Sequence, residues 1–473
     1  MSGIITYENL RISPYRLTRL QELEIVKRVN EHSRLFLTGI VPEELKDTYV
    51  GMTDIHTNIE ITQLDEQSNG IPLFSGLVTN IEIKAVRDIY YMQVEAVSHT
   101  YILDIRRRRR SFQDKNMSYF DMVQQMMADY PWVDFMDVAS EGASIGKFTM
   151  QYDETDWQFL KRMSSRLSTG LVPASNFEKP KFYFGIPQGS SKGTLEDFNY
   201  SVQKKLANYR DSSENSDHNI DVNDFIYYEV ETSKIMEIGS EVQFKEKSLY
   251  VSTVHTQMKN SVVSHVYNLC PLEGLYQSPI DNPIAGISIE GEVISVSKNN
   301  VKVHLEIDKK QSVGKATWFP YSSVYTAEGN TGWYVMPELG DAVKVYFPSN
   351  KEEEGYVLSS IRKDLKDGDS NKLENPQIKY FRTASGKELM FSPEEIVITG
   401  KDGEIYIRLN EVDGIEIFSK KPINFISEED IIMDSQKKII IKAEQEINMS
   451  CRDSSITMRE GSTRFKGKDV KTN

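Results

Sequence analysis

The sequence predicts a mainly β protein, with an α+β first half, a small barrel and a C-terminal β-helix. Three observations predict this order. Apolar and polar residues alternate in parts of the first half, short strand-like segments crowd residues 284–361, and an eight-residue apolar repeat fills the last part of the chain. At roughly 150 residues per domain, the length of 473 residues suits about three domains.

The composition excludes several classes of protein. With 27% charged and 10% aromatic residues, the chain is too polar for an integral membrane protein and too aromatic for a disordered one. The net charge of −14 argues against general nucleic-acid binding, so we expect no nucleic-acid partner. Two cysteines, Cys270 and Cys451, cannot form a disulfide framework. No signal pattern or 18-residue apolar run occurs, so we expect a protein made in the cytosol without a general export signal.

The first half mixes strands with helices. Residues 73–83 and 90–97 alternate as strands do, and residues 118–130 are rich in Met and aromatic residues up to a proline, which indicates a helix. Thr155-Asp-Trp-Gln158 has the form of a capping box that opens a second helix through about Leu167. One face of that helix carries apolar residues, which we interpret as core rather than as a cofactor site. These residues are Trp157, Leu160 and Leu167.

Polar stretches suggest where the chain divides. Residues 209–223 are rich in Ser, Asn and Asp and predict an exposed loop, while residues 363–376 resemble a linker. Two prolines in residues 277–283 mark a softer boundary. The predicted domains are a β-rich region with inserted helices at 1–278, a barrel at 284–362, a linker at 363–378 and a triangular β-helix at 379–473.

The middle region predicts strands only. Residues 289–296 and 301–307 form a hairpin around an Asn-rich turn. Three more strands are expected at residues 332–336, 341–347 and 355–361. About five strands in this length suit a small Greek-key barrel of the oligonucleotide/oligosaccharide-binding (OB) type. Such barrels serve unrelated functions, and a carbohydrate-binding barrel would require an exposed aromatic platform in this region.

The C-terminal part carries a repeat of apolar pairs separated by one residue. From Ile415 onward the pairs are spaced by 8, 8, 8, 8 and 9 residues. Residues two apart share one face of a strand, so each pair is expected to point inward from one short strand of a β-solenoid. The predicted needle-core residues are Ile396/Ile398, Ile405/Ile407, Ile415/Ile417, Ile423/Phe425, Ile431/Met433, Ile439/Ile441, Ile447/Met449 and Ile456/Met458.

Two kinds of solenoid fit this repeat. One chain with three octads per coil would complete only about 2.7 coils, barely the three or so repeats that a stacked array needs. If three chains interlace, each octad forms one face and advances about 4.8 Å, which gives a needle about 40 Å long. We favour the homotrimer, because it pairs every strand edge laterally and removes the aggregation hazard of an open ribbon.

The chain as a whole resembles the VgrG-type spike proteins of contractile injection systems, which include the hub and spike proteins of phage baseplates. The resemblance covers nearly the whole sequence. Its motifs are Asn30-Glu-His-Ser33, Leu103-Asp-Ile-Arg106, Arg110-Ser-Phe-Gln113, Gln151 to Leu160, Trp318-Phe-Pro320, Met336 to Phe347, Gly355 to Ser360 and Arg382 to Phe391.

This resemblance implies a homotrimer at the centre of an injection machine. Its first part would form a pseudo-sixfold hub on which the inner-tube protein ring polymerises, and its needle would lead membrane puncture when a sheath contracts. The implied partners are baseplate proteins, a separate tip-capping (PAAR-like) protein, separate effectors and, transiently, the target membrane. The spike would assemble in the bacterial cytoplasm at the tip of the particle and be ejected through the envelope on firing. The machine itself could be a type VI secretion system, a phage tail or a tailocin.

The sequence predicts no catalytic site and no cofactor. A lysozyme domain needs well over 100 residues, but only residues 363–378 separate barrel from needle, and fifteen residues follow Met458. No Ser-His-Asp, Cys-His or paired-carboxylate pattern stands out. The chain is therefore interpreted as non-enzymatic. The alternative is a phage or tailocin spike with cell-wall lytic activity.

Three further features have modest interpretations. All seven histidines precede the needle, which excludes a His-ligated metal at the apex. Of these, His99 and His304 lie in strand-like patterns and are interpreted as structural or surface histidines. The run Arg106–Arg110 is interpreted as a solvated edge or an ion-pairing surface at a subunit contact rather than a nucleic-acid or membrane site. Cys451 follows Ile447 and Met449 at two-residue intervals, so it is expected on the same face of the strand. This predicts three thiols near the trimer axis rather than a metal site.

Overall fold

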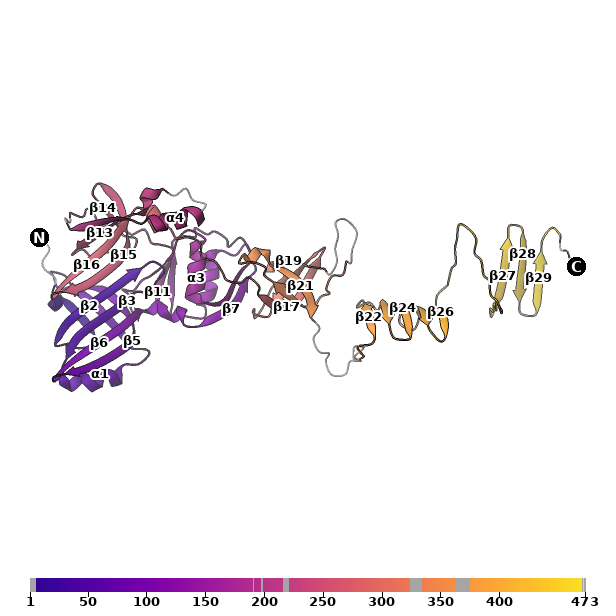
Figure 1. Cartoon of the computed structure of the whole chain (residues 1–473), viewed down its shortest axis with the longest axis horizontal. Coiled ribbons are helices and arrows are strands. Elements are labelled where there is room, and N and C mark those ends of the chain that lie inside the picture. Colours follow the sequence, from indigo (N-terminus) through magenta and orange to yellow (C-terminus); the bar gives the residue numbers. More distant parts are fainter. Residues whose placement is uncertain are drawn as a thin grey trace. The chain divides into compact units, whose positions relative to one another are not determined.

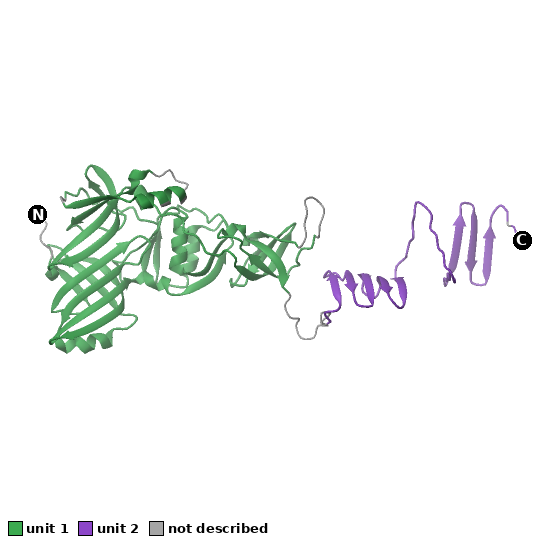
Figure 2. Ribbon diagram, viewed as in Figure 1, with its two compact units in different colours: residues 1–363 green, residues 364–473 purple. Residues whose placement is uncertain are grey.

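The computed structural model describes residues 6–189, 191–196, 199–215, 221–323, 334–361, 375–469 and 471. The chain divides into two compact units, residues 1–363 and 364–473 (Figure 2). The N-terminal unit contains all of the described α-helices and the apolar cores, whereas the C-terminal unit consists of strands and irregular segments. The fold class is mainly β, as the sequence predicts.

One sheet of eleven strands forms most of the hub, by which we mean residues 6–278 (Figure 1). It is built from two groups of strands that join where β2 pairs with β15, with Ile25 opposite Thr256. Each group closes over its own apolar core. The strands across the sheet are β1 (Leu10–Ser13), β4 (Asn58–Leu64), β5 (Gly70–Val86), β6 (Ile89–Ser98), β3 (Arg34–Val41), β2 (Arg19–Arg28), β15 (Lys247–Lys259), β16 (Val262–Cys270), β13 (Ile226–Thr232) and β12 (Tyr200–Lys204), with β14 (Glu241–Phe244) paired to β15.

An α/β segment is inserted between these two groups of strands. Its helices are α2 (Tyr119–Met127) and α3 (Asp156–Ser165), the second of which is labelled in Figure 1. Both pack on a third apolar core. Its strands form two small sheets, β10 (Leu171–Pro173), β11 (Lys181–Phe184) and β8 (Asp134–Asp137) in one, and β7 (Arg107–Phe112) and β9 (Thr149–Thr155) in the other. Both helices lie where the sequence predicts them, and Ser118 and Thr155 are their N-caps.

Two further α-helices and several 3₁₀ turns complete the described part of the N-terminal unit. The helix α1 (Lys46–Met52) lies between β3 and β4, and α4 (Leu206–Asn215) follows β12. The prediction of a loop over residues 209–223 is therefore wrong for its first part, while residues 216–220 lie outside the described residues. In the described residues, no helix has both the length and the apolar character needed to cross a membrane. The 3₁₀ turns are Tyr7–Asn9, Glu43–Leu45, His99–Asp104, Val222–Phe225, Leu272–Leu275, Val313–Lys315 and Glu352–Glu354.

The barrel is a five-stranded sheet whose two end strands meet. Tyr321, directly after the edge strand Trp318–Pro320, forms a bridge with Val357 in the other edge strand, Tyr356–Ile361. The predicted hairpin and the last two predicted strands are present, but residues 334–336 form no strand, and Gly332 and Trp333 lie outside the described residues. The fifth strand is instead β19. In sheet order the strands are β19 (Trp318–Pro320), β18 (Asn300–Leu305), β17 (Ser288–Ser297), β20 (Ala342–Tyr346) and β21 (Tyr356–Ile361).

The C-terminal unit consists of two antiparallel meanders separated by residues 420–445, which form no strand in the single chain (Figure 1). Tight turns at Gly403 and Gly414, both with positive φ, connect successive strands of the first meander. The strands are β22 (Lys379–Arg382), β23 (Glu388–Phe391), β24 (Glu395–Lys401), β25 (Ile405–Asn410) and β26 (Gly414–Ser419), then β27 (Glu446–Cys451), β28 (Ser454–Arg459) and β29 (Ser462–Lys466).

Candidate functional site

The start of α3 positions the residues that join the hub to the barrel. Thr155 closes the predicted capping box: its hydroxyl accepts a hydrogen bond from the Gln158 N–H at 3.1 Å, and the Gln158 side chain accepts one from the Thr155 N–H at 3.0 Å. The predicted apolar stripe is confirmed, because Trp157 and Leu160 are buried and Leu167 packs against the same core. The helix ends at Ser165, two residues before the predicted end.

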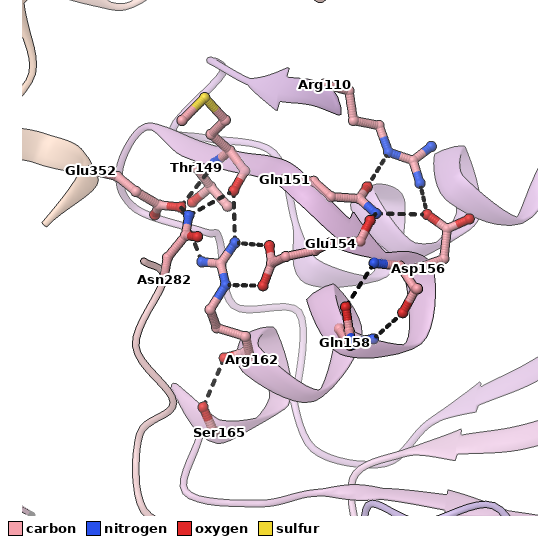
Figure 3. A network of polar contacts seen from close by, with 12 residues as sticks. Arg110, Thr149, Gln151, Glu154, Asp156, Gln158, Arg162, Ser165, Asn282 and Glu352 are labelled. Atoms are coloured by element: carbon pink, nitrogen blue, oxygen red, sulfur yellow. Dashed lines mark hydrogen bonds and ion pairs between the residues drawn. The ribbon is translucent and has the colours of Figure 1, made fainter. Parts of the chain in front are cut away.

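Arg162 on the opposite side of α3 is the centre of a buried ion network (Figure 3). Its side chain is only 1% exposed and donates to Glu154 on β9 at 2.7 and 2.9 Å. It also donates to Glu352 of the barrel at 3.0 Å, and the Glu352 side chain is 2% exposed. The carbonyl of Met150 accepts a further hydrogen bond at 2.7 Å. One buried guanidinium thus binds two carboxylates from different domains.

Two further side chains complete the coordination of Glu352. Arg166 donates to the second carboxylate oxygen, and the Asn282 amide, from the segment between hub and barrel, donates to the first at 3.1 Å. Burial on its own lowers the pKa of Arg162, but hydrogen bonds and attraction to Glu154 and Glu352 outweigh burial, and the pKa is raised. The guanidinium therefore stays charged, and the network fastens the barrel to the hub.

Apolar packing crosses the same junction. Phe148 and Met150 precede or lie on β9 of the hub, yet both belong to the barrel's apolar core. The Phe148 ring contacts Phe319 and Phe347 of the barrel, with ring centroids 5.2 and 5.9 Å apart. Hub and barrel are therefore joined by both a buried ion network and a shared core.

The arginine run alternates along β7. Arg108 and Arg110 turn inward to the carboxylate of Asp156, which is fully buried, and both also lie within ion-pair distance of Asp129. Arg109 points outward and donates to Asp153 at 2.8 and 2.9 Å. Three of the five arginines are thus paired within this chain. The inward pair holds β7 against α2 and α3.

Histidines have structural positions in the hub and barrel. His99 is buried, and burial lowers its pKa. Burial also lowers the pKa of His265 to about 4, with repulsion from Lys27 as a smaller cause. His304 contacts the carbonyl of Asp308 at 2.9 Å. Across the described part of the chain, which leaves out His218, no group of three or more His, Cys, Asp or Glu side chains is arranged to hold a metal ion.

The first meander of the C-terminal unit presents one apolar face. Its register places residues of successive strands directly opposite each other, and residues opposite each other share a face. Six predicted needle residues lie on this face, and all six are exposed in the single chain, Ile415 to 74%. One cross-strand row is Phe381, Leu389, Ile398, Ile407 and Ile417, and the adjacent row is Phe391, Ile396, Leu409 and Ile415.

The opposite face of this meander mixes charged with apolar and aromatic side chains such as Met390, Tyr406 and Phe418, and several of its charged groups are paired within the chain. Arg382 forms ion pairs with Glu388 at 2.7 Å and with Asp402 at 2.8 Å. Arg408 pairs with Glu395 at 2.5 Å. The charged groups of this mixed face therefore have partners of their own, whereas most side chains of the apolar face stay exposed among the residues that the structure describes.

The ten remaining predicted needle residues lie either in the second meander or in the segment between the two meanders. Ile447 lies opposite Met458, and Met449 opposite Ile456, so these four share one face of the second meander. The other six lie between the meanders, where the single chain forms no strand and leaves them exposed. They are Ile423, Phe425, Ile431, Met433, Ile439 and Ile441.

Several residues on these surfaces were missed by the pair pattern. Leu389, Phe391 and Leu409 lie on the apolar face of the first meander, and Phe465, opposite Ile456, lies on that of the second. Leu409 follows Ile407 by two residues, so strict alternation could have found it. The Arg162–Glu352 pair spans 190 residues of sequence, and no sequence pattern joins its two members.

Comparison with known proteins adds to this geometry. Residues 290–361, essentially the barrel strands, match a family model described as the type VI secretion system/phage-baseplate injector OB domain. No curated protein matches the chain.

Solved structures match much more of the chain. An Escherichia coli protein, c3393, described as a type VI secretion component structurally similar to bacteriophage T4 tail proteins gp27 and gp5, is 14% identical, with a TM-score of 0.52 over 75% of this chain and 99% of that one. A chain of the half-lidded Francisella PdpA–VgrG complex is 10% identical, with a TM-score of 0.54 over 88% and 87%. A chain of the lidless PdpA–VgrG complex is 10% identical, with a TM-score of 0.52 over 84% and 93%.

This chain has the fold of a VgrG-type spike protein. The resemblance seen in the sequence motifs is thereby confirmed, and the barrel motifs from Trp318 onward lie inside the region that the family model matches. In this VgrG-type fold the ion network of Arg162 lies at the junction of hub and barrel. The apolar meander faces lie in the part that the sequence assigns to the needle.

Proposed function

We propose that this protein is the homotrimeric central hub and spike of a contractile injection machine, and that it acts without catalysis. The hub nucleates the inner-tube protein ring and contacts baseplate proteins. The needle leads the particle through the target membrane, with a tip-capping protein and effectors carried as separate chains. The spike assembles in the bacterial cytoplasm and leaves through the envelope on firing.

The observation that carries this proposal is the apolar face of the C-terminal strands. In two continuous cross-strand rows of Ile, Leu and Phe, every side chain except the half-buried Leu389 is exposed. Charged groups on the other face of the same strands are already ion-paired. Exposed apolar area of this extent is costly in water and marks an association surface. Three copies packed around one axis would bury the rows, which is the arrangement that the octads predict.

The rigid link between hub and barrel supports a mechanical role. A spike has to transmit the force of sheath contraction from hub to needle. The shared core of Phe148 and Met150 and the buried network of Arg162 and Glu352 make hub and barrel one unit. Such a junction suits load transfer better than a flexible linker would.

Tube nucleation tests the proposed hub function directly. The purified full-length chain would be mixed with the inner-tube protein encoded beside its gene, and the products viewed by electron microscopy. We expect tubes that begin at one end on a spike and a shorter lag before tubes appear. A lag that does not change with spike concentration would contradict the proposal.

The alternative is a spike with cell-wall lytic activity on the same scaffold. The chains described above are named for secretion and tail components, and their names state no lytic activity. A turbidity or peptidoglycan-release assay on the purified chain separates the two functions. We expect no hydrolysis, and release of muropeptides at a rate proportional to protein concentration would establish the alternative.

A further inference from the structure

A groove of about 710 Å³ runs along β7 at the junction of hub and barrel. Its lining includes the six consecutive residues 106–111. Neighbouring side chains of a strand point to opposite faces. A groove bordered by five consecutive residues of β7, Arg107–Ser111, therefore runs along the strand's edge. The other walls are Gln125 of α2, Asp129 just after that helix, Asp153, and the barrel residues 307–310.

The edge of β7 that faces this groove is open. In its sheet β7 pairs with β9, and among the described residues no strand pairs with its other edge. The Ser111 N–H points away from β9 and donates to a carboxylate oxygen of Asp308 at 2.6 Å. The pair has a bulge between Arg108 and Arg109, but its extra residue, Asp153, belongs to β9. Backbone groups therefore still alternate along β7, and the N–H and C=O groups of Arg107 and Arg109 point the same way as those of Ser111. These groups can accept an added strand.

The groove is strongly cationic in an otherwise acidic protein. Seven Arg and Lys side chains and three Asp side chains line it, although the whole chain has a net charge of −14. Arg106, Arg107, Lys309 and Lys310 are exposed, and no carboxylate of the described residues lies within ion-pair distance of them. These four cations are available to a ligand.

Specific contacts fix the two walls relative to each other. Besides the Ser111 contact, Asp308 is held through its carbonyl by His304 at 2.9 Å. The Gln113 amide donates to the carbonyl of Val303 at 3.1 Å. The loop that carries Lys309 and Lys310 is therefore held beside β7. Arg109 is also fixed, since it is bound to Asp153 and its guanidinium lies 4.5 Å from the centre of the Tyr152 ring.

We propose that this groove binds an extended, carboxylate-rich segment of a second protein, which adds as a third strand to β7. Because the Arg109 guanidinium is held by Asp153, Arg107 is the cation of β7 that can pair with a carboxylate of the added strand. Lys309 and Lys310 line the opposite wall and can pair with its other carboxylates. Guanidinium groups bind carboxylates through paired hydrogen bonds, which adds geometric selectivity.

The features of the groove favour a separate acidic protein over other occupants. Within the hub and barrel, alternating acidic pairs such as Glu22/Glu24, Glu229/Glu231 and Glu290/Glu292 lie on strands that are already paired on both sides. A nucleic acid has no backbone N–H groups in strand geometry, and Asp129 and Asp153 in the groove repel phosphates.

The test is peptide binding to the full-length protein, measured by fluorescence anisotropy with a labelled peptide of alternating Glu and Thr. A Gln/Thr peptide of equal length and an N-methylated Glu/Thr peptide serve as ligand controls. We expect binding of the Glu/Thr peptide that weakens as salt is raised, and little binding of either control. Equal binding of the N-methylated peptide would overturn strand addition, and equal binding of the Gln peptide would overturn carboxylate recognition.

Matched variants locate the site. Arg107→Gln/Lys310→Gln removes two unpaired groove cations and should weaken binding about tenfold. Lys84→Gln/Lys259→Gln makes the same charge change at exposed positions elsewhere in the hub and should leave binding unchanged. Equal effects of the two variants would overturn the location. Tighter binding of single-stranded DNA than of the peptide, or dissociation of the oligomer by the peptide, would overturn the proposed occupant.

Discussion

At the scale of single residues, the N-terminal unit buries ionisable groups. Their burial determines how the free energy of unfolding depends on pH. His265 lies between Thr256, whose hydroxyl is 2.8 Å from Nδ1, and Gln63, whose amide oxygen is 3.1 Å from Nε2. Since the amide oxygen can only accept, Nε2 carries the proton and Nδ1 accepts from Thr256. Both nitrogens are thus satisfied by the neutral ring, and Lys27 nearby opposes a second proton.

The first prediction follows from this arrangement. The folded pKa of His265 is lowered to about 4, so between about pH 6.5 and 4 the unfolded chain binds a proton that the folded chain does not. The free energy of unfolding should therefore fall as pH falls through this window, by about 3 kcal/mol from this residue. His265→Gln should remove that part of the pH dependence in denaturant titrations. His255→Gln, at a half-exposed histidine, should retain it; an unchanged slope in His265→Gln would contradict the assignment.

The second prediction concerns the junction network. Arg162→Met leaves the carboxylates of Glu154 and Glu352 without their shared buried partner, and breaking a buried pair from one side typically costs about 3–5 kcal/mol. We expect a lower unfolding midpoint in chemical denaturation and faster proteolytic cleavage between hub and barrel. Lys147→Met removes an exposed ion pair with Glu353 across the same junction, which is worth at most about 1 kcal/mol. Similar losses of stability in Arg162→Met and Lys147→Met would show that burial of the network does not add to its stabilising effect.

At the scale of elements, local sequence rules find strands and helices where one face is apolar or a cap is present. They find α2 through its Met and aromatic residues before Pro131, α3 through the capping box at Thr155, and β5 and β6 through alternation. They miss α4, because Ser, Asn and Asp favour turns locally and Tyr209 packs onto Phe225 only in the fold.

Other elements depend on partners that are distant in sequence. The strand β19 has only three residues and exists because it pairs with β18. Glu352, in a run of three glutamates that suggests a solvated surface, is buried by Arg162 and Arg166. Neither result follows from a local pattern, because the partner that determines it lies far away in the chain.

The third prediction tests the inward and outward assignment of the needle. In the proposed trimer, Ile439 and Ile441 of three chains place six isoleucines in one layer, and their burial contributes on the order of 9–18 kcal/mol. Ile439→Asp would remove three of them and place three carboxylates near one axis, which is costly unless the strands open or the acids stay protonated. We expect loss of protease resistance of the needle and loss of machine activity.

Lys438 supplies the matched control for this prediction. It precedes Ile439 directly, so in a strand it points to the other face and outward to solvent. Lys438→Asp should change stability by no more than about 0.5 kcal/mol per chain and preserve both protease resistance and activity. Equal behaviour of Ile439→Asp and Lys438→Asp would show that the octad assignment is wrong.

At the scale of the whole molecule, the two units differ in how many of their apolar side chains a single chain can bury and how many of their polar groups it can pair. The N-terminal unit buries several apolar cores and most of its polar groups pair within the chain. The C-terminal unit leaves nearly all of its large apolar side chains exposed or half-exposed, and its middle segment has no strand partners. The proposed trimer would bury these needle faces, whereas the N-terminal unit already buries its cores within one chain.

The last prediction follows from this difference. Multi-angle light scattering of the full-length protein at micromolar concentration should give a mass near three times 54.3 kDa. A truncation ending at Arg362 removes the apolar meander faces. The truncated chain should therefore stay folded but form a weaker trimer that dissociates more readily. Hub contacts between copies could keep some of it associated, and the comparison is therefore made as a dilution series. A monomeric full-length chain would refute the trimer, and identical dissociation of both chains would show that the needle contributes nothing to assembly.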